Sequence, residues 1–180
     1  MITAFIIGCE IGFWVLVLAG LACRYLLRQK TLGATLLILT PIVDLILIIA
    51  TVLDLRGGAT ATPIHGLSAI YIGVSIAYGH KMIAWADARF AHRFAGGPAP
   101  TPKPKHGAEH AAYERRMWFH HLLAWTIGCL VLLGMIWYVD DAGRTENLLG
   151  TLRLWSLVVG LDFLYSFSFS LWPKKAKQQL

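Results

Sequence analysis

Residues 32–53, LGATLLILTPIVDLILIIATVL, decide the fold class of this 180-residue chain. A helix needs about 20 mostly apolar residues to cross the hydrocarbon core of a bilayer, and this run has that length. Backbone groups in lipid must be hydrogen-bonded within the protein, which leaves helices and closed barrels as spanning structures. The run lacks the strict polar–apolar alternation of a barrel strand. It therefore predicts a transmembrane α-helix.

Similar apolar runs recur along the chain, and 57% of its residues are hydrophobic. Together they give five predicted spans, at residues 3–27, 32–53, 64–84, 118–139 and 148–172. Residues 85–117 form a polar loop, the largest stretch outside the spans. We predict an all-α polytopic membrane protein, a single domain whose five transmembrane helices form a bundle, with a cytoplasmic amphipathic segment after the third span.

The basic residues predict how the chain is oriented. Of the 16 lysines and arginines, 13 lie in residues 24–30, 81–116 and 174–177. The other three are Arg56, Arg144 and Arg153. Basic residues collect on the cytoplasmic face, so we expect an N-terminus outside and a C-terminus in the cytoplasm. The net charge of +6 then reflects topology and gives no case for nucleic acid.

Three carboxylates, Glu10, Asp44 and Asp162, lie inside predicted spans. A charged side chain at the bilayer centre costs about 2.5–3.5 kcal/mol on insertion scales, so such residues usually face a bundle interior and mark a site. Burial disfavours the charged form of a carboxyl group, which suits reversible protonation. We predict an ion or proton site built from Asp44 and Asp162, with Glu10 and His65 nearer the outside.

Small and hydroxyl-bearing residues share helical faces with these acids. This polar stripe consists of Thr40, Thr51, Ser68, Ser75, Tyr165 and Ser166. It predicts that the first, second, third and fifth helices surround the site, while the fourth faces lipid. The alternative is that the acids only hold helices together, although polar contacts between membrane helices average about 0.6 kcal/mol in one protein.

The stretch 81–94 has helical periodicity, with aromatic and basic residues side by side. We expect it to lie in the headgroup plane and to bind anionic headgroups. The residues predicted to bind lipid are Lys81, Trp85, Arg89 and Arg93. Prolines between 98 and 104 favour an extended linker after it.

The sequence gives weaker evidence for catalysis, for a bound metal or cofactor, and for a dimer. No G-x-S-x-G, P-loop or H-E-x-x-H motif occurs, so no catalytic residue is predicted and metal ligands stay unassigned. A bis-histidine b-type haem on His80 and His121 is one option for a cofactor, although interfacial histidines can equally sit among headgroups. Gly8 and Gly12 form a small-xxx-small pair, which suits either a homodimer or packing within the chain.

Several short stretches together resemble one known family. They are residues 8–11 (GCEI), 41–45 (PIVDL), 65–69 (HGLSA), 85–90 (WADARF), 93–98 (RFAGGP) and 171–173 (LWP). The chain resembles the YmcC-like family of small bacterial integral membrane proteins over nearly its whole length. The resemblance implies a multi-pass protein of a bacterial cell membrane, and it implies no substrate, cofactor or catalytic residue.

Three functions stay open on the sequence. The leading hypothesis is a small ion- or solute-handling membrane protein that is proton-linked through its buried carboxylates. The alternative is a non-catalytic membrane factor that binds lipid or a partner protein through its basic cytoplasmic loop. The third is a b-type haem redox subunit.

Overall fold

The computed structural model describes residues 2–94 and 96–174. Side chains are described for these residues except at positions 2, 3, 6, 10, 30, 41 and 44. Its elements are five α-helices: α1 (Ile2–Tyr25), α2 (Lys30–Arg56), α3 (Pro63–Phe94), α4 (Gly107–Val139) and α5 (Ala142–Leu171). No strand occurs among the described residues, which confirms the predicted all-α class.

Four of these helices are long and apolar enough to cross a membrane. The corresponding segments are Ile7–Tyr25, Thr31–Arg56, Gly107–Val139 and Ala142–Leu171. The exception is α3, whose glycine, serine, tyrosine and histidine residues dilute its apolar character. Because α3 packs against all four other helices, protein covers much of its surface and a less apolar sequence is tolerated.

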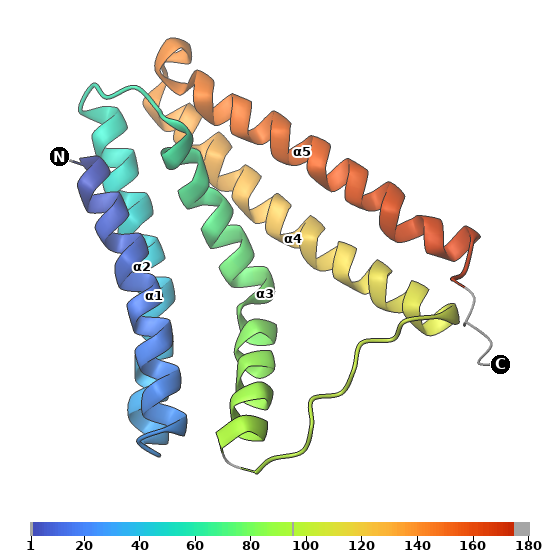
Figure 1. Cartoon of the computed structure of the whole chain (residues 1–180). Helices are drawn as coiled ribbons and strands as arrows, with labels where there is room; N and C mark the ends of the chain where they lie inside the picture. The colour runs from blue at the N-terminus through green and yellow to red at the C-terminus, as the bar shows by residue number, and fades with distance from the viewer. Residues whose placement is uncertain (1, 95, 175–180) are drawn as a thin grey trace.

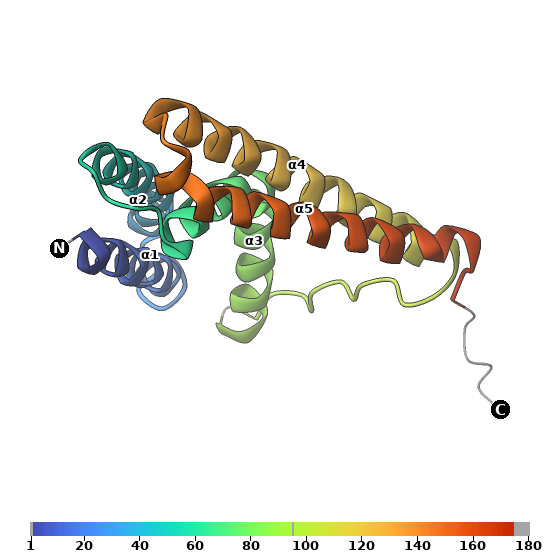
Figure 2. The same cartoon turned by 90° about the horizontal axis from the view of Figure 1, so that it is seen from above.

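The helices form two hairpins that meet across α3. Figure 1 shows α1 beside α2 and α4 beside α5, with α3 between the two pairs. The pairs meet at the end with the short loops 57–62 and 140–141, here called the loop end. They diverge toward the linker end, where the drawn-out segment 96–106 joins α3 to α4 (Figures 1 and 2).

Bare glycine backbone sets the contacts among α3, α4 and α5. A Cβ at Gly73 would overlap the carbonyl oxygen of Ala124, and one at Gly128 would overlap the ring of Trp155. Small residues let membrane helices approach closely, because packing contacts are what hold helices together in lipid. The expectation that the fourth helix faces lipid is therefore wrong, since α4 lies between α3 and α5 and buries Ala124 completely.

The loop end is held by hydrogen bonds between the loop 57–62 and the first turns of α5. The Ala61 N–H donates to the Arg144 carbonyl at 2.7 Å, and the Asn147 amide donates to the Ala61 carbonyl at 2.7 Å. The Arg144 guanidinium also donates to the Leu55 carbonyl at 2.8 Å. Beneath them lies an apolar cluster that includes Leu55 and Leu148, so both hairpins are anchored at this end.

The stretch 81–94, predicted as a separate amphipathic segment, is the last part of α3. Arg24 of α1 forms an ion pair with Asp87 at 3.0 Å, and the rings of Tyr25 and Phe90 lie 5.4 Å apart. These contacts align the end of α3 with the end of α1. The helical character of the stretch is confirmed, and its continuity with α3 is the difference from the prediction.

Gly73→Ala should lower the free energy of unfolding by about 1–3 kcal/mol, the usual cost of forcing extra atoms into a packed interior. Gly79→Ala is the matched control in the same helix, because a Cβ at Gly79 would meet no described atom within 4 Å. Thermal unfolding of both variants in one detergent measures the difference. Equal midpoints would contradict a tight contact between α3 and α4.

Asp141 caps the first turn of α5 and titrates outside the spans. The Arg144 N–H donates to its Oδ1 at 3.1 Å, and the Arg144 Nε donates to its Oδ2 at 2.8 Å. The backbone hydrogen bond first, and the guanidinium second, hold the pKa of the Asp141 carboxyl below its ordinary value of 3.8. A lowered folded-state pKa means that this contribution to stability is present above the ordinary value and is lost as pH falls through the folded value.

Asp141→Asn keeps a capping oxygen but removes the charge. Wild type should therefore unfold at a higher temperature than Asp141→Asn near about pH 7, and the difference in midpoint should narrow as pH falls below 3.8 and Asp141 takes up its proton. Thermal midpoints measured across this range test the effect. If the difference in thermal midpoint between wild type and Asp141→Asn stayed constant down to acidic pH, the charge of Asp141 would contribute nothing to stability.

Candidate functional site

The main polar contact between α4 and α5 pairs a histidine with an acid. Nδ1 of His121 lies 2.8 Å from Oδ2 of Asp162, and the side chains are 23% and 32% exposed. His121 lies 18 residues from the end of α4, so the pair is about 27 Å from the loop end at the helical rise of 1.5 Å per residue. The pair thus lies toward the linker end of two long apolar helices.

Trp155 and Asp162 agree on which nitrogen of His121 carries the proton. The Trp155 Nε1–H donates to His121 Nε2 at 3.3 Å. An indole nitrogen can only donate, and a neutral imidazole has one donor and one acceptor nitrogen. His121 Nε2 must therefore accept, which leaves the proton on Nδ1, where it is donated to Asp162. The three side chains form one directed chain of hydrogen bonds.

Apolar and aromatic groups surround this chain. Trp155 is buried against Ala124 and Val159. The Trp118 ring lies 5.1 Å from the ring of Phe163, and its Nε1–H donates to the Val159 carbonyl at 3.2 Å. Such surroundings make each hydrogen bond electrostatically stronger than in water and make an unpaired charge costly.

Ser166 completes the pair on the α5 side. This buried residue donates to Oδ1 of Asp162 at 3.4 Å, so both carboxylate oxygens of Asp162 have a polar neighbour. Ser166 and Asp162 were both predicted site residues, and the structure places them together. Tyr165, also predicted, is exposed and stacks on Phe169, so it does not belong to this cluster.

A second histidine–acid pair lies at the loop end. His65 is buried, and its Nε2 lies 3.5 Å from Oδ2 of Asp54 on α2. The Thr62 N–H donates to His65 Nδ1 at 3.0 Å, so Nδ1 is the acceptor and the ring proton is on Nε2, which makes no hydrogen bond with the described groups although Asp54 is near. Ser68 donates to the His65 carbonyl at 2.7 Å, one turn further along α3.

The remaining residues of the predicted polar stripe are divided between helices. Thr40 is buried and donates to the Leu37 carbonyl at 2.8 Å, within its own helix. Thr51 is fully buried, and its hydroxyl has no partner among the described groups. Ser75 is partly buried on α3, between the two histidine–acid pairs.

The predicted site joined Asp162 to Asp44, with Glu10 and His65 nearby. The side chains of Glu10 and Asp44 lie outside the described residues; their backbones belong to α1 and α2. Among the described residues, α5 packs along α3 and α4, and it meets α2 at the loop end, where Arg144 donates to the Leu55 carbonyl. Asp162 is thus placed with His121, a partner that the sequence argument did not give it.

The other predicted residues do not belong to either histidine–acid pair. His80 is exposed, while both ring nitrogens of His121 are occupied by Asp162 and Trp155. Lys81 lies 3.5 Å from Nδ1 of His120. Trp85 is 56% exposed, with the Arg89 guanidinium 4.6 Å from its ring.

Arg93 is also exposed. Gly8 and Gly12 have no described atom within 4 Å of an added Cβ, so neither is a packing contact within the chain. No group of three or more potential metal ligands occurs among the described residues.

A hairpin rule would have found both pairs in the sequence. In an antiparallel hairpin, residues equally far from the turn lie side by side. His121 and Asp162 are placed almost symmetrically about 140–141, and Asp54 and His65 about the loop 57–62. Depth and helical faces, on which the predicted site was based, do not show this symmetry.

The comparisons with known proteins agree with the quoted family stretches. The chain is 47% identical over 172 residues to a Bacillus subtilis (strain 168) protein named uncharacterized membrane protein YmcC, a match that covers 96% of the chain and 92% of the relative. The chain belongs to the YmcC-like family of membrane proteins. Family membership and four long apolar helices make it an integral membrane protein. No family model and no solved structure matches it.

The tautomer of His121 is directly measurable. Nitrogen NMR of ring-labelled histidine in the full chain should show His121 protonated at Nδ1 and not at Nε2 near neutral pH. Trp155→Phe keeps an aromatic ring but removes the donor, so the nitrogen signal of Nε2 should shift as it loses its hydrogen bond, while the Asp162 carboxylate still holds the proton on Nδ1. His120, next in the chain, has its Nδ1 2.7 Å from the Arg116 carbonyl instead and should keep its signal. An unchanged His121 signal in Trp155→Phe would contradict the assignment.

Proposed function

We propose that this protein handles an ion or solute in a proton-linked manner, with His121 and Asp162 as the proton-carrying pair. The observation that carries the proposal is the directed hydrogen-bond chain from Trp155 through His121 to Asp162, set between two long apolar helices. Ionisable residues at such positions usually mark ion pathways or proton relays. A purely structural contact between helices needs neither an ionisable pair nor a fixed tautomer.

The geometry of the pair suits the transfer of a proton. Nδ1 of His121 and Oδ2 of Asp162 lie 2.8 Å apart, so a proton could pass between them without movement of either helix. Oδ1 of Asp162 accepts from the Ser166 hydroxyl, which continues the polar contacts along α5.

The second pair extends the proposal along the bundle. His65 and Asp54 lie near the loop end, and Ser68, Ser75 and Tyr78 follow His65 on α3 at helical spacing. From His65 to Tyr78 is 13 residues, or about 20 Å of helix. We propose this face of α3 as the route between the two pairs.

Three parts of the proposal rest on the sequence: the roles of Glu10 and Asp44, the number of membrane crossings, and the orientation. Glu10 and Asp44 are included because they are carboxylates within apolar runs. The proposed topology has five crossings, with α3 as the third, an outside N-terminus and a cytoplasmic C-terminus. It is supported by the basic residues, which gather at the linker end.

Proton movement in reconstituted vesicles tests the proposal. Vesicles holding a pH dye receive a membrane potential and then gradients of inorganic cations, amino acids and sugars in turn. Wild type should move protons with at least one of them, while His121→Gln and Asp162→Asn should fall to the level of protein-free vesicles.

The two control variants change a histidine and an aspartate that lie outside the proposed pair. His120→Gln changes the neighbouring histidine, which faces Lys81. Asp140→Asn changes an exposed acid with φ 49°, a conformation that asparagine adopts readily. Both controls should behave as wild type. Full activity in His121→Gln and Asp162→Asn would contradict the proposal, and silence of wild type with every gradient would favour the lipid- or partner-binding alternative.

A further inference from the structure

A shallow apolar groove runs between α2 and α4 near the loop end. Ile48 and Val52 line it from α2, and Val131, Gly134 and Met135 line it from α4. Its volume is about 370 Å³, at the lower end of the range for small-molecule sites. It is open along its length, so it suits a flexible chain lying in it and not an enclosed ligand.

Gly134 makes the groove deep enough to hold a chain. A Cβ at this position would meet no described atom within 4 Å, so the missing side chain leaves space on the surface and not between helices. Gly73 and Gly128 allow other helices to approach, whereas no described atom of another helix lies within 4 Å of a Cβ at Gly134.

Arg56 stands over the loop end of this groove. It follows Ile48 and Val52 at intervals of four residues, so all three share one face of α2. Its guanidinium lies 4.5 Å from the centre of the Tyr138 ring and donates to the Tyr138 hydroxyl. In the part of the chain that the structure describes, no carboxylate lies within ion-pairing distance of Arg56, whereas Arg24 and Arg144 each have an aspartate.

Trp137 and Tyr138 indicate the depth of Arg56 in the bilayer. Trp137 is 82% exposed and Tyr138 is 44% exposed, next to each other at the end of α4. Exposed tryptophan and tyrosine residues on membrane helices gather at headgroup depth. Arg56, stacked on Tyr138, therefore lies where lipid phosphates lie, and the groove extends from it toward the hydrocarbon core.

We propose that this face binds one anionic phospholipid, with an acyl chain in the α2–α4 groove and the headgroup phosphate on Arg56. An unpaired guanidinium complements a phosphate, to which it can donate two parallel hydrogen bonds. The apolar groove complements the chain that descends from the same headgroup. The site is distinct from both histidine–acid pairs and stands whether or not they carry protons.

Native mass spectrometry of the full chain in a neutral detergent tests the site with phosphatidylglycerol and phosphatidylcholine as probes. Wild type should bind phosphatidylglycerol more tightly. Arg56→Gln should weaken phosphatidylglycerol binding about fivefold, the effect of one basic residue near an anionic lipid surface, and weaken phosphatidylcholine binding less, because the choline ammonium already compensates the phosphate of that lipid. Gly134→Leu should weaken both, because its side chain fills the groove.

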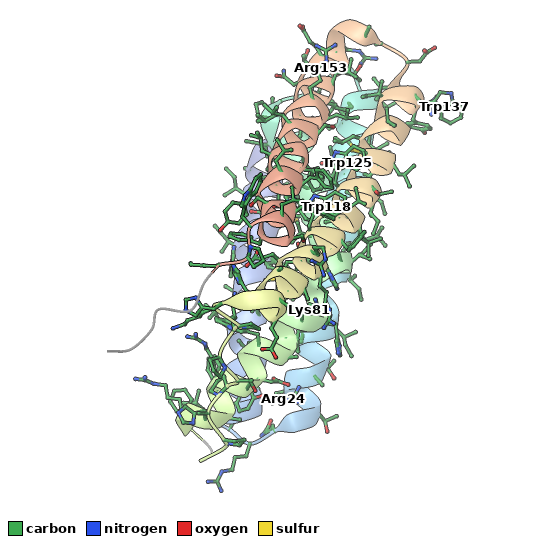
Figure 3. The ribbon with its side chains drawn as sticks, turned by 90° about the vertical axis from the view of Figure 1, so that its right-hand side faces the viewer. Arg24, Lys81, Trp118, Trp125, Trp137 and Arg153 are labelled. Carbon is green, nitrogen blue, oxygen red and sulfur yellow. The ribbon has the colours of Figure 1, made fainter. Side chains whose placement is uncertain are left out.

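Arg153→Gln is the matched control. Arg153 is another exposed arginine, and Figure 3 shows it on α5, away from Trp137 on α4. This variant should bind both lipids as wild type does. Equal binding of the two lipids by wild type would overturn the proposal, as would equal effects of Arg56→Gln and Arg153→Gln. If Gly134→Leu kept the thermal midpoint of wild type and still bound both lipids equally well, the groove would not be the site of the acyl chain.

Discussion

The ring of Trp155 rests on the bare backbone of Gly128, and the polar centre of the molecule depends on that contact. With a side chain at Gly128, the indole could not lie against α4. Its N–H would then not reach His121, and Nε2 of His121 would lose its donor, although the Asp162 carboxylate would still accept from Nδ1. The missing side chain of a glycine thus supplies one of the hydrogen bonds of a pair more than a helical turn away.

Apolar length was enough to predict the helical class and most of each helix from the sequence. In lipid, the hydrophobic run and the need for internal backbone hydrogen bonds leave little choice. The same reasoning could not rank the helices by burial. It put α4 toward lipid because its span lacks acids, whereas enclosure follows from Ala124 and Gly128, whose role depends on what packs against them.

The candidate site was predicted in part. Intramembrane charge identified Asp162 and the polar neighbour Ser166, because a carboxylate in an apolar run is rare enough to stand out. Its partner was missed, since His121 was considered as a haem ligand and not as the residue opposite Asp162 in a hairpin. The apolar groove could not be read from the sequence at all, because it is formed by two helices that are distant in the chain.

The linker 96–106 has a mechanical consequence. Its four prolines favour the extended polyproline form, with about 3.1 Å of length per residue, so its 11 residues reach about 34 Å. Proline-rich chains resist both collapse and stretching. The segment thus acts as a strut that holds the end of α3 and the start of α4 at a set separation. Because hydrogen bonds fix the opposite end of the bundle, any relative swing of the two hairpins must pivot there and stay within the reach of this strut.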